Sequence, residues 1–422
     1  MAFWVHFAAA KHPDRIAIQG PERSMTYAEL SSAAISAANA VRRTGARDRV
    51  ALALPAGEEF VIALHGCLLA GVAAVPIDLR LGEEERKPRL AGAEFVVSEP
   101  LRESQGTIAP MFEGDPPVAV MHTSGTTAAP KPVVLSYSNF QTSALGSAVA
   151  LGLDPAERWL CPMPLTHVGG LSIPIRSAIY ASTAVLHGRF DTEAVLNELM
   201  DPSRRITLVS LVPTMLARLL DAGLDRPPTL RWALLGGGPI PPALLERAAA
   251  AGVPVAPTYG MTETCSQIAT FGWHLPGAEI RTSHGEVIVR GPMVSAPELA
   301  EDGWLYTGDL GRFDDRGRLQ ITGRKSDTIV TGGENVAPAE VEAVLLEHPA
   351  VGDAGVFARP DPEWGEALVA AVVLRDGVGV DAEELRAFCA ARLASFKVPR
   401  AVHFTERLPR TESGKLLRRQ LG

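Results

Sequence analysis

Residues 49–76, RVALALPAGEEFVIALHGCLLAGVAAVP, decide the fold of this chain. A strand-length apolar run is followed by an apolar run of helix length and then by a second strand-like run that continues to residue 79. The same order recurs where 206–213 precedes 214–223 and where 229–238 precedes 241–252. In the last of these, proline at the first helical turn and glycine after the last turn predict the two ends of the helix. Apolar strands that alternate with helices are typical of parallel sheets covered on both faces. The sequence therefore predicts an α/β protein with mostly parallel sheets.

The pattern changes near Gly285. Short alternating strands are predicted at 285–291 and 315–322, with turn residues between them. Beyond them a new unit begins, with helices predicted at 338–349 and 381–393 and strands at 353–360 and 367–374. We place the domain boundary between Arg324 and Asp327, directly after a strand, so that the expected domains are 1–325 and 326–422.

Composition limits the possible classes of function. The 422 residues are 46% hydrophobic and 21% charged, with a formal net charge of -8. Such a chain can bury a large core but lacks the broad cationic face of a general nucleic-acid or membrane-surface binder. The N-terminal segment does not match a signal peptide, and no run of about 18 apolar residues predicts a membrane span. The four cysteines stand far apart without a CxxC pair, which argues against a zinc site or a disulfide framework and favours the cytoplasm.

The first motif with chemical meaning is TSGTTAAPK at 123–131, directly after the apolar run 117–122. Small hydroxyl residues and a glycine let the backbone approach phosphate oxygens, and a lysine adds a mobile positive charge. A Ser/Thr-rich surface turn is the alternative interpretation, and the spacing is not that of a Walker A loop. The candidate phosphate-binding residues are Thr123, Ser124, Gly125, Thr126, Thr127 and Lys131.

The second motif, TYGMTE at 258–263, follows a strand-like run. The Tyr259 ring can stack on a nucleobase, Gly260 permits a tight turn, and the Thr262 hydroxyl can bind phosphate. The Glu263 carboxylate can hold a hard divalent cation such as Mg²⁺. The alternative is a strand end with Thr262 as a helix cap.

Two further motifs lie toward the C-terminus. In 304–334, Asp309 can accept the hydroxyls of a ribose and Arg324 can reach the same ribose or a phosphate. As alternatives, Asp309 is a hairpin-turn residue, Arg324 a solvated charge, and Gly332 with Gly333 only a turn. In LPRTESGK at 408–415, Ser-Gly presents Lys415 on a loop suited to delivering charge when a domain closes, although a lysine in a basic tail is usually solvated.

Taken together and in this order, these segments resemble the adenylate-forming superfamily, which contains acyl- and aryl-CoA ligases, peptide-synthetase adenylation domains and luciferases. The resemblance covers essentially the whole chain through TSGTT-x-x-PK, YGMTE, YTGD, GRK-x-D…GGEN and LPRT-x-SGK. Ala128 stands where the family usually has glycine. Pro257 stands where many members carry an amide near the adenine, so the adenine contacts would fall to backbone groups, with Gly236, Gly237 and Gly238 packing against the ring.

The resemblance implies a fold and a mechanism. The fold is α/β, with a large N-terminal domain of layered, mostly parallel sheets and a small β-barrel-like subdomain, followed by a small mobile α+β C-terminal domain. The cofactor is Mg²⁺, held by Glu263, and ATP and CoA are co-substrates. Lys415 neutralises charge while the carboxylate attacks ATP, helped by Thr262. The C-terminal domain then turns about Ser326 and brings Gly332, Gly333 and Glu334 to the site for the CoA step.

Within the superfamily, the chain resembles the o-succinylbenzoate:CoA ligases of menaquinone biosynthesis at 164–177, 210–216, 234–241 and 259–268. Arg176 lies in an otherwise apolar stretch, where an unpaired guanidinium is costly, so a substrate with a second carboxylate would supply its partner. The alternative is an arginine whose stem covers apolar neighbours at a helix surface. His167 can face the same ligand only if it lies in the loop before the helix. The proline and two glycines of PLTHVGG at 164–170 predict such a loop.

The predicted reaction is ATP-dependent ligation of a carboxylic acid to CoA through an acyl-adenylate, with 2-succinylbenzoate as the acid. A CoA ligase for another aryl or fatty acid, a free-standing adenylation enzyme loading a carrier protein, and a non-catalytic nucleotide-binding protein are the alternatives. The expected partners are the small-molecule carboxylic acid, ATP and CoA, without nucleic acid or membrane insertion, and a homodimer is left open.

Overall fold

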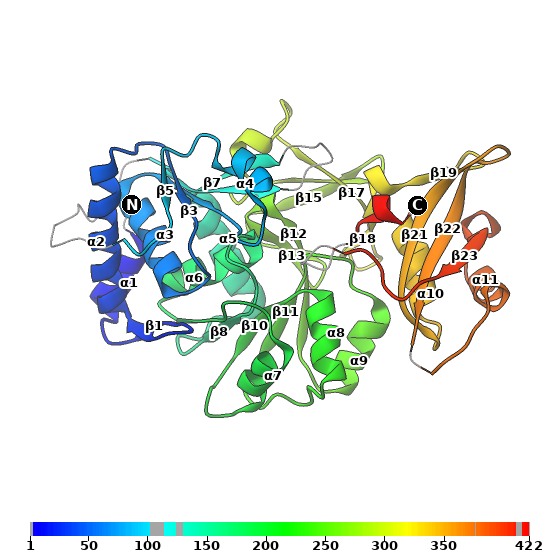
Figure 1. The fold of residues 1–422 in the computed structure, drawn as a ribbon, viewed down its shortest axis with the longest axis horizontal. Helices are drawn as coiled ribbons and strands as arrows, with labels where there is room; N and C mark the ends of the chain where they lie inside the picture. Colours follow the sequence, from blue (N-terminus) through cyan, green and yellow to red (C-terminus); the bar gives the residue numbers. More distant parts are fainter. Residues whose placement is uncertain (1–2, 102–113, 124–129, 376, 411–415, 422) are drawn as a thin grey trace.

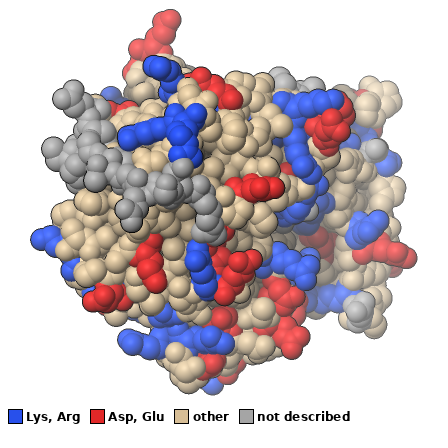
Figure 2. All heavy atoms as spheres, turned by 60° about the vertical axis from the view of Figure 1, so that its left-hand side comes forward, with Lys and Arg blue, Asp and Glu red and all other residues tan. Residues whose placement is uncertain are grey.

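The computed structural model describes residues 3–101, 114–123, 130–375, 377–410 and 416–421. The molecule is elongated in Figure 1, with helices α1 (Trp4–Lys11) and α2 (Tyr27–Thr44) at one end and a C-terminal sheet at the other. No helix among the described residues combines the length and apolarity needed to cross a membrane. Acidic and basic side chains are interspersed on the face shown in Figure 2, which therefore presents no broad cationic surface.

Two sheets form the N-terminal part, and their parallel strands confirm the predicted class. The five-stranded sheet has the order β5-β3-β4-β6-β7, parallel except for the antiparallel pair β6–β7. The nine-stranded sheet has the order β14-β13-β12-β11-β10-β8-β9-β1-β2 and is parallel from β12 to β1. The strands of the first are β3 (Arg49–Leu52), β4 (Ala73–Pro76), β5 (Phe95–Val97), β6 (Pro117–Thr123) and β7 (Lys131–Ser136). Those of the second are β1 (Ile16–Gln19), β2 (Ser24–Thr26), β8 (Arg158–Cys161), β9 (Thr183–Leu186), β10 (Leu208–Leu211), β11 (Trp232–Leu235), β12 (Val255–Met261), β13 (Ser266–Thr270) and β14 (Trp273–His274).

Helices cover these sheets and share their core. One hydrophobic cluster joins residues of both sheets with α2, α3 and α6. Helix α3 is apolar all round and almost wholly buried, as expected for a helix packed on several sides. At α9, Pro242 occupies the first turn and Gly252 follows the helix with a φ of +62°, which confirms the predicted start and stop signals. The helices that follow α2 in this part are α3 (Glu58–Ala70), α4 (Glu83–Leu90), α5 (Tyr137–Leu151), α6 (Val168–Tyr180), α7 (Thr192–Met200), α8 (Pro213–Asp221) and α9 (Pro242–Ala250).

A four-stranded antiparallel sheet follows, in the order β15-β16-β17-β18. It contains β15 (Glu279–Ser283), β16 (Glu286–Arg290), β17 (Leu305–Phe313) and β18 (Leu319–Arg324). The prediction of a barrel-like subdomain needs correction, because β15 and β18 are the edges of this sheet and the described strands do not close on each other. Short alternating strands indicate antiparallel pairing, but closure depends on strand number and stagger, which alternation does not reveal.

The C-terminal unit has its own sheet and its own hydrophobic core. Its strands are β19 (Ile329–Thr331), β20 (Glu334–Val336), β21 (Val351–Asp361), β22 (Gly365–Leu374) and β23 (Ala401–Phe404), and its helices are α10 (Pro338–Leu346) and α11 (Ala382–Ala390). Strand β18 ends at Arg324, and the 3₁₀ turn Lys325–Asp327 follows it directly. The domain boundary between Arg324 and Asp327 stays a prediction.

Candidate functional site

The two flanks of the predicted phosphate loop lie side by side. Thr123 ends β6, Lys131 begins β7, and the two residues are paired in the antiparallel register. Ser124, Gly125, Thr126 and Thr127 lie outside the described residues. The Lys131 ammonium forms an ion pair with Glu298, a residue of the 3₁₀ turn Ala296–Glu298. The lysine of the motif is thus fixed at the end of the hairpin that carries the loop.

The YGMTE motif begins in strand β12 and ends in the 3₁₀ turn Thr262–Thr264. Gly260 is required by packing, because a Cβ atom at this position would lie 1.7 Å from the Ser266 carbonyl oxygen. The helix-cap interpretation of Thr262 is wrong, because Thr262 is the first residue within this turn and Met261 takes the cap position. The Met261 backbone N–H donates to the Thr264 hydroxyl at 3.0 Å. The hydroxyl of Thr262 is therefore not used as the cap of this turn.

Glu263 sits among charges of both signs. Burial is the main cause that raises the pKa of its carboxyl, and the carboxylate of Glu298 raises it further, while Lys131 and Arg324 act in the opposite direction. A divalent cation that binds beside a half-buried carboxylate with an acidic neighbour stabilises the charged form of that carboxylate. The described residues hold no group of three or more metal-binding side chains. Mg²⁺ bound mainly through substrate phosphates needs only one or two carboxylates, so Glu263 fits that form of site.

Asp309, Arg324 and Tyr259 meet at one place. Asp309 lies directly opposite Arg324 in the β17–β18 ladder, and Arg324 Nε is 2.7 Å from Asp309 Oδ1. The Tyr259 hydroxyl donates to Asp309 Oδ2 at 2.9 Å. The hairpin-turn alternative for Asp309 is wrong because the residue lies within β17, and Arg324 is not merely a solvated charge. Each carboxylate oxygen can accept a further hydrogen bond, so Asp309 retains the capacity to bind hydroxyls.

Gly236, Gly237 and Gly238 follow the end of β11, as predicted for a segment beside a planar ring. A Cβ atom on Gly236 would lie 2.7 Å from Thr258 Cγ2, and Gly237 has a φ of +80°, a left-handed conformation that favours glycine. The structure thus explains two of these glycines by packing and backbone conformation. Their contact with an adenine stays a prediction.

The two predicted acyl-site residues lie at the start and in the body of α6. His167 is the residue before the helix, as its predicted loop position required, and its side chain is exposed. Arg176 is buried within the helix, with only 2% of its surface exposed. Its Nη2 donates to the Ser143 hydroxyl at 3.0 Å, and its guanidinium carbon is 5.6 Å from the Trp159 ring centroid. The alternative of a surface arginine is wrong.

No acidic side chain of the described part of the chain forms an ion pair with Arg176. Burial lowers the pKa of the Arg176 guanidinium, and the nearby Tyr180 and Cys265 oppose that change only in part. A charged group in this position is costly unless an anion joins it. Arg176 therefore has the properties expected of an anion receptor inside the fold.

The boundary segment divides its charged side chains between the two sides. Arg324 is paired with Asp309, and Lys325 Nζ is 2.9 Å from Glu286 Oε2, both within the N-terminal part. Asp327 Oδ2 instead lies 2.7 Å from Arg418 Nη1 of the C-terminal unit. Ser326 is exposed and stands between the two sets. This arrangement suits a hinge at Ser326.

Gly332 and Gly333 connect β19 to β20, with φ values of +58° and +83°. Two positive φ values in a two-residue hairpin loop favour glycine, so both residues form a turn. Glu334 begins β20 and is exposed. Lys415 lies outside the described residues. The roles of Gly332, Gly333, Glu334 and Lys415 in a CoA step stay predictions.

Sequence reasoning missed Glu298 and Glu286, the carboxylates that hold Lys131 and Lys325. Both acids come from segments distant in sequence from their partners, and neither belongs to a motif with a recognisable spacing. The sequence carried no signal for either pair, because the side chains of Lys131 and Lys325 are 58% and 67% exposed and an exposed lysine needs no acidic partner. Long-range pairs of this kind are set by tertiary structure and not by local pattern.

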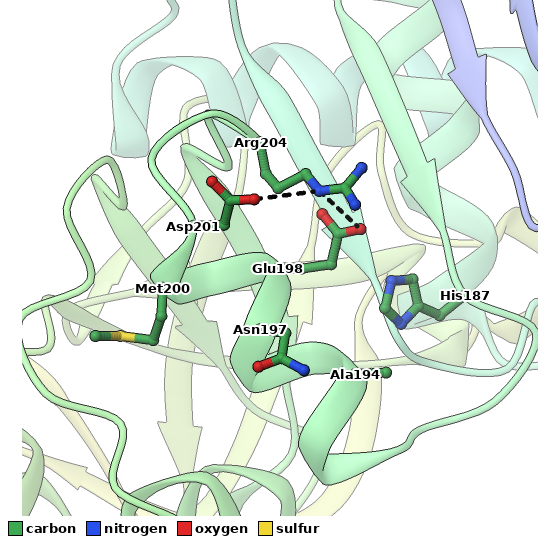
Figure 3. Close-up of a pocket in the computed structure, with 7 residues that line it drawn as sticks. All are labelled: His187, Ala194, Asn197, Glu198, Met200, Asp201 and Arg204. Atoms are coloured by element: carbon green, nitrogen blue, oxygen red, sulfur yellow. Dashed lines mark ion pairs between the residues drawn. The ribbon is translucent and has the colours of Figure 1, made fainter.

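Figure 3 shows a surface hollow beside α7 that contains none of the predicted site residues. Arg204 Nε lies 3.6 Å from Asp201 and 3.9 Å from Glu198, so the charges in the hollow are paired with each other. The residues that line it are His187, Ala194, Asn197, Glu198, Met200, Asp201 and Arg204. We assign the chemistry to the motif residues and not to this hollow.

Comparison with known proteins places these motifs in a family. The family described as AMP-binding enzyme matches residues 5–98 and 94–291, and its C-terminal domain matches 340–415. The chain is 40% identical to a 2-succinylbenzoate--CoA ligase of Bacillus licheniformis, over 99% of this chain and 98% of that protein. The structure of o-succinylbenzoate CoA synthetase from Bacillus subtilis with its acyl-adenylate intermediate is similar at a TM-score of 0.91 and 38% identity, covering 100% of this chain and 98% of that one. The complex of the same synthetase with ATP and magnesium ion gives a TM-score of 0.88 at 37% identity, covering 100% and 99%.

Proposed function

This chain belongs to the family of AMP-binding enzymes, and from that premise we propose that it joins 2-succinylbenzoate to CoA at the expense of ATP. The reaction forms 2-succinylbenzoyl-adenylate and pyrophosphate first, and 2-succinylbenzoyl-CoA and AMP second. The full-length similarity to 2-succinylbenzoate ligases and to the adenylate-bound synthetase supports both steps.

The observation that carries the choice of acid is the burial of Arg176 without an acidic partner among the described residues. A simple aryl or fatty acid has one carboxylate, which is consumed in the adenylate and leaves nothing to pair with this guanidinium. A dicarboxylate keeps a second anion for it. The buried Arg176 therefore favours 2-succinylbenzoate over a monocarboxylic acid.

In the first step, the substrate carboxylate attacks the α-phosphate of ATP and pyrophosphate leaves in line. Catalysis consists of positioning and neutralising charge. Lys131 holds the outer phosphates, Thr262 donates to a phosphate oxygen, and Glu263 holds Mg²⁺, which neutralises phosphate charge. Lys415 bridges the carboxylate and the α-phosphate.

The nucleotide's sugar is held at the carboxylate of Asp309. Arg324 and Tyr259 fix that carboxylate from two directions, at 2.7 Å and 2.9 Å. The carboxylate therefore needs no rearrangement when the ribose hydroxyls arrive. This preorganisation lowers the entropic cost of binding the nucleotide.

In the second step, the CoA thiol attacks the acyl carbon and AMP leaves. The C-terminal unit turns about Ser326, withdraws Lys415 and brings the Gly332–Gly333 hairpin to the site. The division of ion pairs on either side of Ser326 supports this motion, since rotation there leaves both sets intact. We also propose the cytoplasm as its location, in keeping with four free thiols.

The test measures pyrophosphate release and acyl-CoA formation with a panel of acids. The panel contains 2-succinylbenzoate, an analogue in which its second carboxylate is replaced by hydrogen, benzoate and a medium-chain fatty acid. We expect CoA-dependent product with 2-succinylbenzoate at the highest kcat/KM. Equal use of the monocarboxylic analogue would overturn the substrate, and pyrophosphate release without acyl-CoA would favour a carrier-loading enzyme.

A further inference from the structure

The turn Ser295–Glu298 lies between the phosphate-loop lysine and Glu263. The Ser295 backbone N–H donates to the Glu263 carbonyl oxygen at 2.8 Å. The Ser295 hydroxyl donates to the carbonyl oxygen of Val134 at 2.8 Å, and Val134 belongs to the same strand as Lys131. Ser295 is fully buried. A single residue thus ties the strand of Lys131 to the turn of Glu263, and Glu298 follows three positions later.

Glu298 is placed to direct Lys131. Its side chain is 7% exposed, whereas that of Lys131 is 58% exposed, and the two form an ion pair. A carboxylate held in the structure is the fixed partner, and the flexible lysine is the partner that it orients. Without Glu298, the four-carbon stem of Lys131 would sample many rotamers in solvent.

We propose that Glu298 is a positioning residue of the adenylation step, which holds the Lys131 ammonium beside Glu263 where the phosphates of MgATP bind. The proposal rests on the proposed function, because it needs ATP as the substrate. Glu298 acts through Lys131 and does not itself touch the reacting atoms.

The ion pair does not occupy the lysine completely. An ammonium has three N–H donors, and Glu298 accepts through one oxygen, so donors remain for phosphate oxygens. The same carboxylate adds negative potential at Glu263, which suits a site that receives a divalent cation together with a polyanion. Glu298 therefore orders the site without blocking it.

The experiment compares Glu298→Gln with the wild type and with Glu301→Gln, a matched change at an exposed acid three residues further along. Gln keeps the size of the side chain but removes its charge. We expect the KM for MgATP in pyrophosphate release to rise about tenfold, with kcat within about twofold, because an ordered cation is lost from ground-state and transition-state binding alike. Calorimetric binding of a non-hydrolysable α,β-methylene ATP analogue with Mg²⁺ should weaken by the same factor. Glu301→Gln should change neither quantity.

A Lys131→Met background separates positioning from general damage. If Glu298 acts through Lys131, adding Glu298→Gln to Lys131→Met raises the KM by less than about twofold, so the two changes are not additive. Thioester formation from supplied acyl-adenylate stays at the wild-type rate in every variant. The inference is overturned if Glu298→Gln leaves the KM for MgATP unchanged, or if the effects of the two substitutions on KM multiply fully. In either case the proposed function stands as long as the wild-type enzyme forms acyl-CoA. Absence of wild-type activity overturns the proposed function instead.

Discussion

Replacing Arg176 by methionine tests the acyl site most directly, because methionine keeps the length of the side chain and removes its charge. The guanidinium is 2% exposed, and its described hydrogen bond goes to the Ser143 hydroxyl. Ser143 still donates to the Cys265 carbonyl oxygen at 2.8 Å, so the substitution does not leave that hydroxyl without a partner. We therefore expect Arg176→Met to fold and to keep its surroundings.

The magnitude follows from the charge that methionine removes. Loss of one partner of a buried charge pair costs about 3 to 5 kcal/mol, although water in the pocket reduces it. At about 1.4 kcal/mol for each factor of ten, the KM for 2-succinylbenzoate should rise at least about 100-fold. The ligand-free protein should not suffer, since burying an unpaired cation is costly and its removal is neutral or stabilising.

The assay measures the KM for the diacid, the KM for the analogue without the second carboxylate, the KM for ATP and the thermal midpoint of the free protein. We expect a large rise only for the diacid, and a midpoint equal to or above that of the wild type. Equal weakening of diacid and analogue, or a fall of several degrees in the midpoint, would refute the argument. Either result would make Arg176 a structural residue and remove the main support for the substrate.

Three further predictions concern the C-terminal unit and the core. Lys415→Ala should reduce pyrophosphate release by at least about 100-fold yet leave thioester formation from supplied acyl-adenylate within about twofold, and parallel loss of both half-reactions would contradict it. Gly333→Asn should spare pyrophosphate release while lowering acyl-CoA formation. Its cost in stability should be near 1 kcal/mol because Asn tolerates a left-handed backbone. Gly332 is a poorer target, since a Cβ atom there would lie 2.6 Å from the Trp364 ring. His65 is fully buried, and burial lowers its pKa from 6.5 to about 4. Below pH 6.5 the imidazole of the unfolded chain is protonated, whereas the buried imidazole of the folded chain is not. The free energy of unfolding should therefore fall by up to about 3 kcal/mol between pH 6.5 and 4. In His65→Leu, the thermal midpoint should no longer show this contribution to its dependence on pH.

The sequence predicted the architecture where the local pattern is strong. Apolar runs of strand and helix length gave β3, α3 and β4 at the expected positions, and proline and glycine marked both ends of α9. Closure of the sheet β15–β18 was not predictable, because it depends on edges that meet in space. The start of α6 was also misplaced in part, since the glycines after His167 suggested a loop but lie within the helix.

The candidate site was predictable where one segment carries both the residue and its meaning. The YGMTE and YTGD segments were enough to predict Tyr259, Glu263 and Asp309 as site residues from the sequence alone. What sequence reasoning did not reveal is which groups touch each other. The Tyr259 hydroxyl donates to Asp309, whereas the stacking of its ring on a base stays a prediction. Such contacts join strands β12 and β17, which are neighbours only through the tertiary fold.

The ion pairs at the site reconcile an acidic protein with highly anionic substrates. The chain has a net charge of -8, so its overall field does not attract ATP or CoA. Three described cations near the predicted nucleotide residues, Lys131, Arg324 and Lys325, are each paired with a carboxylate. A polyanion that arrives there finds donors that the carboxylates have already oriented, so local order, and not the overall field of the protein, favours its binding.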